Sequence, residues 1–380
     1  MSSARSVLIV GGGVIGCALA RELARRGASV TVLERAAPGA EASGAAAGLI
    51  APQAEGVPQG PFFDLAAESR GLYPEWCAEL ETETGLSVEW RDGGVLRCDL
   101  DGTKDFASFL FQRESGFPLE EVDGRRIRQI TGGLSSPRAD RGVFFPLDGS
   151  VDPRRLTRAL WVSAERRGVR FVLGATASRF LYRNGRCSGV ETDQGSFEAE
   201  AVVDAAGAWA AFDPERAPVP VRPVRGQIVR LAARPPFLPC VVQSTDVYIV
   251  PRADGSLLLG STEEDVGFHK QVTAEAVAAL CEAAFRLVPS LRQAEFVDAW
   301  SGLRPASQDA KPILGASGTA GLFFATGHFR NGILLAPVTA RRVAEAILGV
   351  PPPELVPFSP ERFKGASNMS GRSGKLEVFG

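Results

Sequence analysis

A glycine-rich turn near the N-terminus constrains the fold more than any other feature of this sequence. A β-branched run at 7–10 leads directly into residues 11–16, which read Gly-Gly-Gly-Val-Ile-Gly. A helical stretch at 17–26 follows, and a second strand-like run at 29–33 ends on Glu34. This order of strand, glycine turn, helix, strand and acidic residue is typical of a βαβ unit that binds a dinucleotide.

Each glycine of the turn has a physical role. Gly11 permits the tight turn, Gly13 lets a pyrophosphate approach the backbone, and Gly16 lets the helix pack closely on the strand. Val14 and Ile15 lie at the start of the helix, where free N–H groups and the positive end of the dipole favour a phosphate. All five positions are candidate cofactor contacts.

The acidic residue after the second strand indicates which nucleotide is bound. Glu34 follows the turn at about the 20-residue spacing at which a carboxylate accepts hydrogen bonds from ribose hydroxyls. Arg35 would tolerate an adenosine 2′-phosphate, but the Glu34 carboxylate would repel one. A structural βαβ unit without a ligand is the alternative, and it leaves the three spaced glycines unexplained.

Composition excludes several classes of protein. The 380 residues are enough for two domains, and a formal net charge of −2 gives no reason to expect nucleic acid or an anionic membrane as partner. With two histidines a histidine-rich metal site is not expected, and none of the six cysteines forms a C-x-x-C pair. No apolar run reaches the roughly 18 residues of a membrane span, and a signal peptide is not evident. We therefore expect a cytoplasmic protein without a metal.

The remaining sequence alternates helical and strand-like patterns. Apolar spacing predicts helices at 64–80, 104–114, 152–167 and 273–285 and a last helix that ends near 348. Strand-like runs lie at 94–100, 169–173, 227–231, 247–251, 257–260 and 321–325. The small-residue loop at 36–48, with Ser43, Ala46, Ala47 and Gly48, can press against a flat ligand, and a flexible linker is the alternative.

A small β-meander is predicted within the nucleotide fold. The Asn-Gly pair at 184–185 separates two strand-like runs and is a type I′ hairpin signal. The Gln-Gly pair at 194–195 separates the second run from a third at 197–203, which enters a turn containing Gly207 and Trp209. A meander inserted in this way is more typical of flavin enzymes than of simple NAD dehydrogenases.

A second glycine turn, at 326–335, follows the strand-like run at 321–325 and precedes the last helix. The free N–H groups at the start of a helix would stabilise negative charge on a reduced flavin. An ordinary strand–helix junction is the alternative, and the residues alone do not decide between the two.

Several segments together resemble the glycine oxidase branch of the D-amino-acid oxidase family of flavoenzymes. They extend over residues 7 to about 350, and the last two are far more specific than the first glycine turn. The matching segments are 10–16 with Glu34, 45–48, 248–252, 300–305 with 309–312, and 327–337.

The resemblance implies an α/β protein of two discontinuous domains. A Rossmann-like FAD-binding domain of the glutathione-reductase type, with the meander inserted, would comprise 1–80, 143–215 and 305–364. A smaller α+β substrate domain with a large, mainly antiparallel sheet would comprise 81–142 and 216–304. Residues 365–380 would form a disordered tail.

The resemblance also implies roles for particular side chains. Arg304 matches the arginine that holds the substrate carboxylate, Tyr248 the tyrosine whose hydroxyl assists it, and Arg330 an arginine beside the pocket and flavin. A guanidinium suits this task because two parallel hydrogen bonds fix a carboxylate's position and angle. Without the resemblance, a salt bridge would be the first interpretation of Arg304 and a core position that of Tyr248. His328 is expected to be structural rather than a base. The implied substrate contacts are Leu49, Tyr248, Arg304 and Arg330, and the implied FAD contacts are Gly11, Gly13, Val14, Ile15, Gly16, Glu34, Arg35, Ser43, Ala46, Ala47, Gly48, Leu49, Ala177, Gly207, Trp209, Arg304, His328, Arg330, Asn331, Gly332 and Ile333.

Two features depart from the family pattern. Sarcosine oxidases attach flavin through a cysteine after the arginine segment, whereas 306–308 here are Ala-Ser-Gln, so we expect FAD without a covalent link. The loop at 263–265 is Glu-Glu-Asp, where a less charged segment would be expected beside a pocket. It is either a solvated loop or a carboxylate near the site that favours a substrate with an added cationic group.

The implied activity is FAD-dependent oxidation of glycine or another small amino acid or amine, with oxygen reduced to hydrogen peroxide. A role in thiamine thiazole synthesis is part of the same resemblance. An FAD-dependent dehydrogenase that passes electrons from a D-amino acid or 2-hydroxy acid to a quinone is one alternative, and a non-catalytic flavin-binding protein is another. The expected partners are substrate and oxygen, with a homo-oligomer left open.

Overall fold

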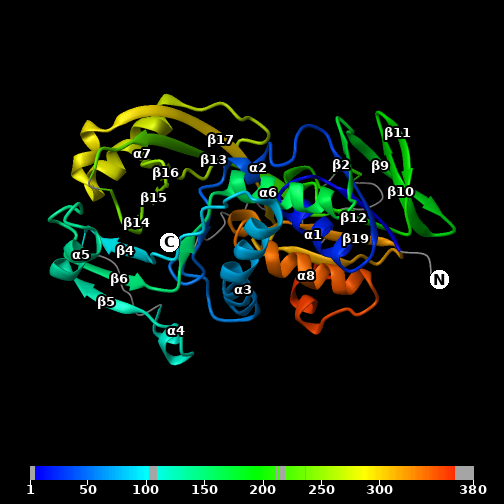
Figure 1. Ribbon diagram of the computed structural model, residues 1–380, viewed down its shortest axis with the longest axis horizontal. Coiled ribbons are helices and arrows are strands. Elements are labelled where there is room, and N and C mark those ends of the chain that lie inside the picture. Colours follow the sequence, from blue (N-terminus) through cyan, green and yellow to red (C-terminus); the bar gives the residue numbers. More distant parts are fainter. Residues whose placement is uncertain (1–4, 102–108, 211, 214–218, 236, 364–380) are drawn as a thin grey trace.

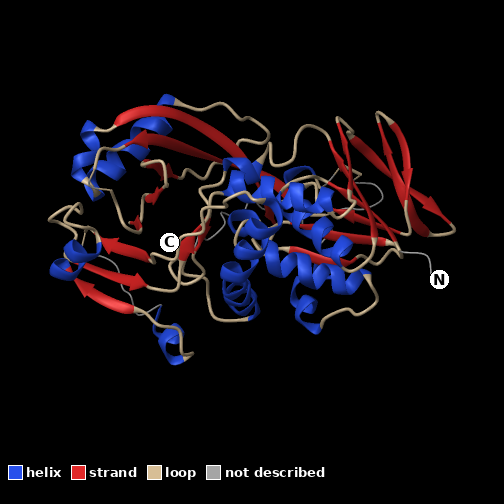
Figure 2. Cartoon of the chain, viewed as in Figure 1, coloured by secondary structure: helices blue, strands red, loops and turns tan. Residues whose placement is uncertain are grey.

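Two large β-sheets organise the computed structural model, which describes residues 5–101, 109–210, 212–213, 219–235 and 237–363 (Figure 1). Figure 2 shows that the helices gather between and beside the sheets. The tail expected at 365–380 and the first part of the helix expected at 104–114 lie outside the described residues. Among the described residues, no helix has both the length and the apolar content needed to cross a membrane.

The first sheet contains the predicted βαβ unit. Its strand order is β18-β19-β12-β1-β2-β8, and all neighbours are parallel except the edge pair β18–β19. The bounds are β1 (Ser6–Val10), β2 (Ser29–Glu34), β8 (Arg170–Leu173), β12 (Ala201–Asp204), β18 (Ile313–Ala316) and β19 (Leu322–Thr326). Both faces of a parallel sheet are usually buried by other elements, and both faces of this sheet are buried.

The alternation of side chains along β1 shows how the two faces are covered. Val7 and Ile9 join one core cluster with four helices, whereas Leu8 and Val10 join another with a three-stranded meander. The helices are α1 (Val14–Arg25), α3 (Pro61–Thr84), α6 (Pro153–Arg166) and α8 (Ala336–Ile347). The meander strands are β9 (Ala177–Arg183), β10 (Arg186–Thr192) and β11 (Gly195–Glu198).

The meander confirms one prediction and corrects another. Asn184 and Gly185 have φ values of 51° and 75°, as a type I′ turn requires. The single strand predicted at 197–203 is wrong, because this run is divided between β11 in the meander and β12 in the parallel sheet. The mostly exposed residues of β11 and the buried residues of β12 belong to different environments, which a continuous apolar run conceals.

The second sheet is mainly antiparallel, in the order β17-β13-β16-β15-β14-β4-β6-β5, and only β14 and β4 pair in parallel. The helix α7 (Ala274–Leu287) covers one face, and the chain at 47–54 packs on the other. The bounds are β4 (Val95–Asp99), β5 (Glu120–Asp123), β6 (Arg141–Phe145), β13 (Val221–Ala232), β14 (Val241–Gln243), β15 (Tyr248–Pro251), β16 (Ser256–Gly260) and β17 (Glu295–Ser307). The shorter elements are α2 (Ala42–Ala45), β3 (Leu49–Ile50), α4 (Leu110–Glu114), α5 (Gly124–Ile130) and β7 (Gly149–Ser150).

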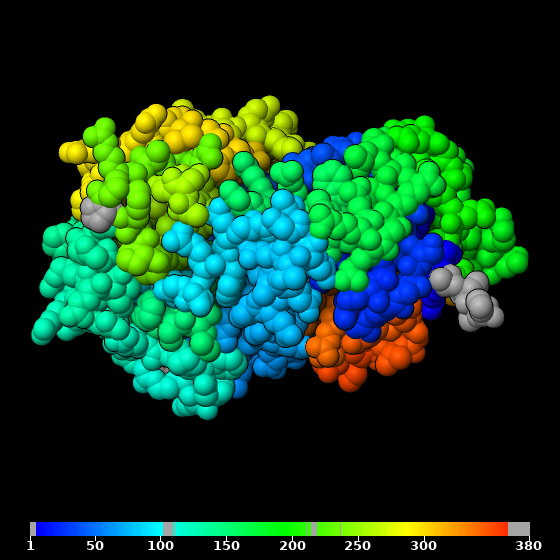
Figure 3. Space-filling view, in the orientation of Figure 1, coloured from blue at the N-terminus to red at the C-terminus, as the bar shows by residue number. Residues whose placement is uncertain are grey.

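The strands of the first sheet come from the segments that the sequence assigns to the FAD-binding domain, and most strands of the second sheet come from those assigned to the substrate domain. Figure 3 shows the blue N-terminal and orange C-terminal segments together on one side, away from the cyan-green segment on the other. The domain limits themselves stay a prediction, and the one at 304 falls within β17.

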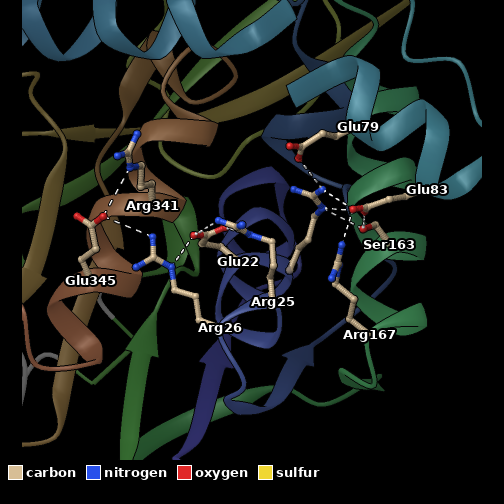
Figure 4. A network of polar contacts seen from close by, with 10 residues as sticks. Glu22, Arg25, Arg26, Glu79, Glu83, Ser163, Arg167, Arg341 and Glu345 are labelled. Atoms are coloured by element: carbon tan, nitrogen blue, oxygen red, sulfur yellow. Dashed lines mark hydrogen bonds and ion pairs between the residues drawn. The ribbon is translucent and has the colours of Figure 1, made fainter. Parts of the chain in front are cut away.

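Ion pairs hold α1 against its neighbours behind the glycine turn. Arg21 is only 2% exposed and contacts Glu79 and Glu83 of α3 at 3.2 and 2.9 Å. Its Nε donates to Ser163 Oγ of α6 at 3.0 Å. Figure 4 shows Glu79, Glu83 and Ser163 converging on this point. The second half of α1 is therefore tied to α3 and α6.

Candidate active site

A cavity of about 280 Å³ lies where the two sheets meet. One end is formed by Glu34 and Arg35 of the first sheet, and the opposite wall by Tyr248 and Arg304 of the second. Of the predicted cofactor and substrate residues, all but Gly16 line this cavity within the described chain. The lining set comprises Gly11, Gly13, Val14, Ile15, Glu34, Arg35, Ser43, Ala46, Ala47, Gly48, Leu49, Ala177, Gly207, Trp209, Tyr248, Arg304, His328, Arg330, Asn331, Gly332 and Ile333.

The glycine turn is shaped by close backbone approaches. Gly11 has φ +107°, and a Cβ there would lie 2.5 Å from the Ala205 carbonyl oxygen. A Cβ on Gly16 would lie 1.9 Å from the Gly11 carbonyl oxygen. Gly16 therefore acts by letting α1 pack on the turn rather than by facing the cavity.

The Glu34 end of the cavity is fixed by hydrogen bonds. The Gly12 and Ala36 N–H groups donate to the two Glu34 carboxylate oxygens at 2.7 and 2.8 Å. The Arg35 guanidinium lies 3.7 Å above the Trp209 ring and forms one wall. These hydrogen bonds hold the Glu34 carboxylate at the cavity, where it can accept hydrogen bonds from a ribose.

The start of α1 and the second glycine turn complete the cofactor side. Ser43 Oγ accepts a hydrogen bond from the Val14 N–H at 2.9 Å. His328 is 2% exposed and its Nε2 lies 3.1 Å from Thr339 Oγ1. Burial lowers the pKa of His328 to about 3, so the ring is neutral at neutral pH. The residues at 328–334, rather than the first turn of α8, line the cavity.

Arg304 presents to the cavity a cation that has no ion-pair partner among the described residues. Its Nη1 donates to the Thr262 carbonyl at 3.0 Å and its Nη2 to Ser261 Oγ at 2.6 Å. Across the described ranges, no carboxylate forms an ion pair with Arg304. Burial lowers the pKa of Arg304, but an arginine stays charged at neutral pH. Glu263 and Glu55 act on Arg304 only through their charge, without an ion pair or hydrogen bond to it. A partly buried cation whose hydrogen bonds all go to neutral groups is suited to an incoming carboxylate.

Tyr248 lies beside this cation. Burial raises the pKa of its hydroxyl, while the charge of Arg304 and a hydrogen bond with Ser261 act in the opposite direction. The phenol is therefore protonated at neutral pH and can donate a hydrogen bond. Ser261 was not predicted from the sequence, since nothing but its position after Gly260 marks it.

Arg330 differs from Arg304 because carboxylates compensate it. Its Nη2 lies 3.0 Å from Glu55 Oε2, and its Nη1 lies 3.8 Å from Glu263 Oε2. Glu55 also lines the cavity, and the sequence did not predict it as a site residue. It comes from a loop far from Arg330 in the chain, and no local motif marks it.

The acidic loop at 263–265 is divided between the site and the surface. Glu263 approaches Arg330, whereas Glu264 pairs with Arg225 and the exposed Asp265 pairs with Arg222. Asp265 therefore fits the interpretation as a solvated loop, whereas Glu263 lies near the site. A preference for a cationic substrate stays a prediction. The carboxylate that reaches the site faces an arginine of the protein.

Two glycines make room for the side chains of this wall. A Cβ on Gly226 would lie 2.3 Å from Arg304 Nη2, and a Cβ on Gly260 would lie 2.4 Å from the Tyr248 hydroxyl. Neither glycine has a positive φ, so an alanine would be tolerated by the backbone there. The side chains at this wall, and not the strands, require these glycines.

We therefore expect Gly226→Ala to displace the Arg304 guanidinium and raise KM for a carboxylate substrate at least about tenfold, because a misplaced anchor loses alignment. FAD content should be unchanged. Steady-state kinetics with Gly71→Ala as control test this, since a Cβ on Gly71 meets nothing within 4 Å. Equal kinetics for both variants would contradict the prediction.

Comparison with known proteins agrees with the fold and identifies the family. The FAD dependent oxidoreductase family, DAO, matches residues 6–346. The chain is 41% identical over 348 residues to the bifunctional protein ThiO/ThiG of Trichormus variabilis, covering 90% of this chain and 53% of that protein. It is 36% identical over 355 residues to the glycine oxidase of Geobacillus kaustophilus, covering 91% and 94%.

A solved structure shows the same architecture. The crystal structure of glycine oxidase from Geobacillus kaustophilus superposes with a TM-score of 0.88 at 34% identity, over 94% of this chain and 99% of that one. The chain belongs to the DAO family of FAD-dependent oxidoreductases, whose cofactor is FAD. It spans about half the length of the ThiO/ThiG relatives that it matches.

The residues that line the cavity are suited to FAD. A dinucleotide needs a glycine turn for its pyrophosphate and an acidic residue for its ribose, and Gly11, Gly13 and Glu34 line the cavity together. Alanines at 45–47 provide a flat wall without long side chains. The cavity continues from there to Arg304, so cofactor and substrate would occupy adjoining parts of one space.

Proposed function

We propose that this protein oxidises glycine or another small amino acid, using FAD and oxygen. The amino acid, oxygen and water are converted to a 2-oxo acid, ammonia and hydrogen peroxide through an imine. The observation that carries the proposal is Arg304, a partly buried cation without an ion-pair partner among the described residues, which lines the cavity. The related glycine oxidase supports glycine as the substrate.

The protein's own groups bind and orient the substrate. Arg304 holds the substrate carboxylate, and the Tyr248 hydroxyl donates a further hydrogen bond to it. When bound in this cavity, FAD would supply the oxidising chemistry, namely acceptance of a hydride from the substrate and return of the electrons to oxygen. Neither neutral His328 nor protonated Tyr248 is suited to act as a base, so alignment is the contribution of the site.

We also propose that the product imine serves thiamine thiazole synthesis in the cytoplasm. The similarity to ThiO/ThiG proteins supports the pathway. The cysteines are all free thiols, which supports a reducing compartment.

The experiment that tests the activity is peroxide release from purified protein with a panel of amino acids and one 2-hydroxy acid. Glycine, sarcosine, D-alanine, D-proline and glycolate would each be supplied with air as the only electron acceptor. We expect peroxide with glycine or another small amino acid. Flavin reduction by a substrate without peroxide release, but with reduction of an added quinone, would instead support a dehydrogenase.

FAD should leave the protein when the fold is lost. No cysteine follows the arginine segment at 300–305, so nothing there would attach the flavin covalently. We expect acid or urea to release all yellow colour into the filtrate of an ultrafiltration membrane. Colour that stays with the denatured polypeptide would contradict this prediction.

A further inference from the structure

Arg330 and Arg304 lie at the same end of the cavity but differ in charge balance. Arg330 lies 3.0 Å from Glu55 and 3.8 Å from Glu263. These carboxylates raise the pKa of Arg330, Glu55 most strongly. Arg304 has only a hydroxyl and backbone carbonyls as bonded partners within the described chain. One arginine is therefore available to an anion, and the other is occupied.

The pairing of Arg330 is built into the fold, because the residue before Glu55 is held on both sides. The Ala54 N–H donates to Asp148 Oδ2 at 2.8 Å. The Ala54 carbonyl accepts from Arg97 Nη1 and Gln243 Nε2, both at 2.9 Å. Asp148 and Gln243 are buried. The Glu55 backbone therefore starts from a position that these hydrogen bonds fix. The Glu55 carboxylate lies near Arg330 without any ligand.

We propose that Glu55 and Glu263 determine substrate specificity by neutralising Arg330, so that the site accepts substrates with one carboxylate and rejects those with a second anionic group. This rests on the proposed amino-acid oxidase function. A second anion directed at Arg330 would meet two carboxylates already in place. Such repulsion is a means of specificity against the wrong ligand.

The proposal predicts a gain of activity rather than a loss. Glu263→Gln removes one negative charge while keeping the side chain's shape. Sarcosine and iminodiacetate are matched probes, since both are N-substituted glycines and only the second has an additional carboxylate. We expect the ratio of kcat/KM for iminodiacetate to that for sarcosine to rise about tenfold or more, since one charge at short range in a partly buried site is involved.

A matched control lies two residues away. Asp265→Asn removes the same charge from the same loop, but Asp265 is exposed and pairs with Arg222. We expect its ratio to stay within about twofold of the wild-type value, because exposed charges are screened. An unchanged ratio in Glu263→Gln, or an equal rise in both variants, would overturn the proposal.

A binding measurement separates this proposal from the proposed function. Acetate and malonate would be titrated into the FAD-bound protein, and the change in flavin absorbance would give their Kd values. We expect malonate to gain about tenfold relative to acetate in Glu263→Gln, and no such gain in Asp265→Asn. If no amine releases peroxide but this selectivity changes, only the oxidase function fails. If peroxide is released but neither ratio changes, only the specificity proposal fails.

Discussion

Arg304→Ala is expected to lower kcat/KM for an amino acid by roughly 10²–10³-fold or more, which corresponds to about 3–5 kcal/mol of lost interaction with a buried carboxylate. The guanidinium lines the cavity without an ion-pair partner among the described residues, and its position is set by hydrogen bonds to Ser261 and Thr262. Removing it leaves the substrate anion without a partner. FAD content should stay near normal, because the glycine turn and Glu34 are on the other sheet.

Steady-state kinetics and the flavin spectrum of the purified variant measure this effect. Arg222→Ala is a suitable control, since Arg222 pairs with the exposed Asp265 rather than facing the cavity. Arg304→Lys should recover only part of the activity, because an ammonium lacks the planar fork that binds both carboxylate oxygens. Wild-type kinetics in Arg304→Ala would show that the carboxylate binds elsewhere.

Asp204→Asn is expected to stabilise the protein increasingly as the pH rises from about 4 to about 8. Asp204 is fully buried at the end of β12, and its Oδ1 accepts from the Ala206 N–H at 2.9 Å. Its Oδ2 has no hydrogen-bond partner among the described residues. Burial raises the pKa of Asp204 from 3.8 to about 8, because a charged form in this place would be desolvated and unpaired.

Proton linkage determines the direction of this pH dependence. A carboxyl group whose pKa is higher in the folded state binds its proton more tightly there, so its contribution to stability is full below about 3.8 and is lost as the pH rises through about 8. The free energy of unfolding of Asp204→Asn, minus that of the wild type, should therefore rise by about 1.4 kcal/mol per pH unit in this window.

Urea unfolding of both proteins at several pH values checks this difference. Asp246→Asn serves as control, because Asp246 is exposed and pairs with Arg286. Its difference from the wild type should stay nearly constant with pH. A difference for Asp204→Asn that falls with pH would mean that Asp204 is ionised in the native state.

Local patterns predicted those parts of the fold whose cause is local. The glycine turn and Glu34 were predicted because a few consecutive residues determine this unit, and the turn at Asn184 and Gly185 because both take positive φ. The run at 197–203 was misread because an apolar stretch does not reveal which sheet receives it. The long strand β17 was not predicted as a strand at all.

The substrate side of the site was less accessible from sequence. Arg304 and Tyr248 were singled out by family resemblance, since an arginine or tyrosine on a strand has many structural uses. Glu55 and Ser261 carry no local signal, because their roles arise from contacts with side chains 43 or more positions away. Tertiary contact decides such roles, and a single sequence does not encode that contact in any short pattern.

The parallel sheet also determines when the cofactor can first be captured. β1 pairs with β12, which pairs in turn with β19, so neighbours in space are among the most distant in the chain. During synthesis the first glycine turn leaves the ribosome early but has no complete sheet beside it until residues 322–326 follow. Contacts of this separation slow folding, because a long loop must close before they form. The cavity that would receive FAD is therefore complete only once residues 325–334, which form part of its lining, have been made.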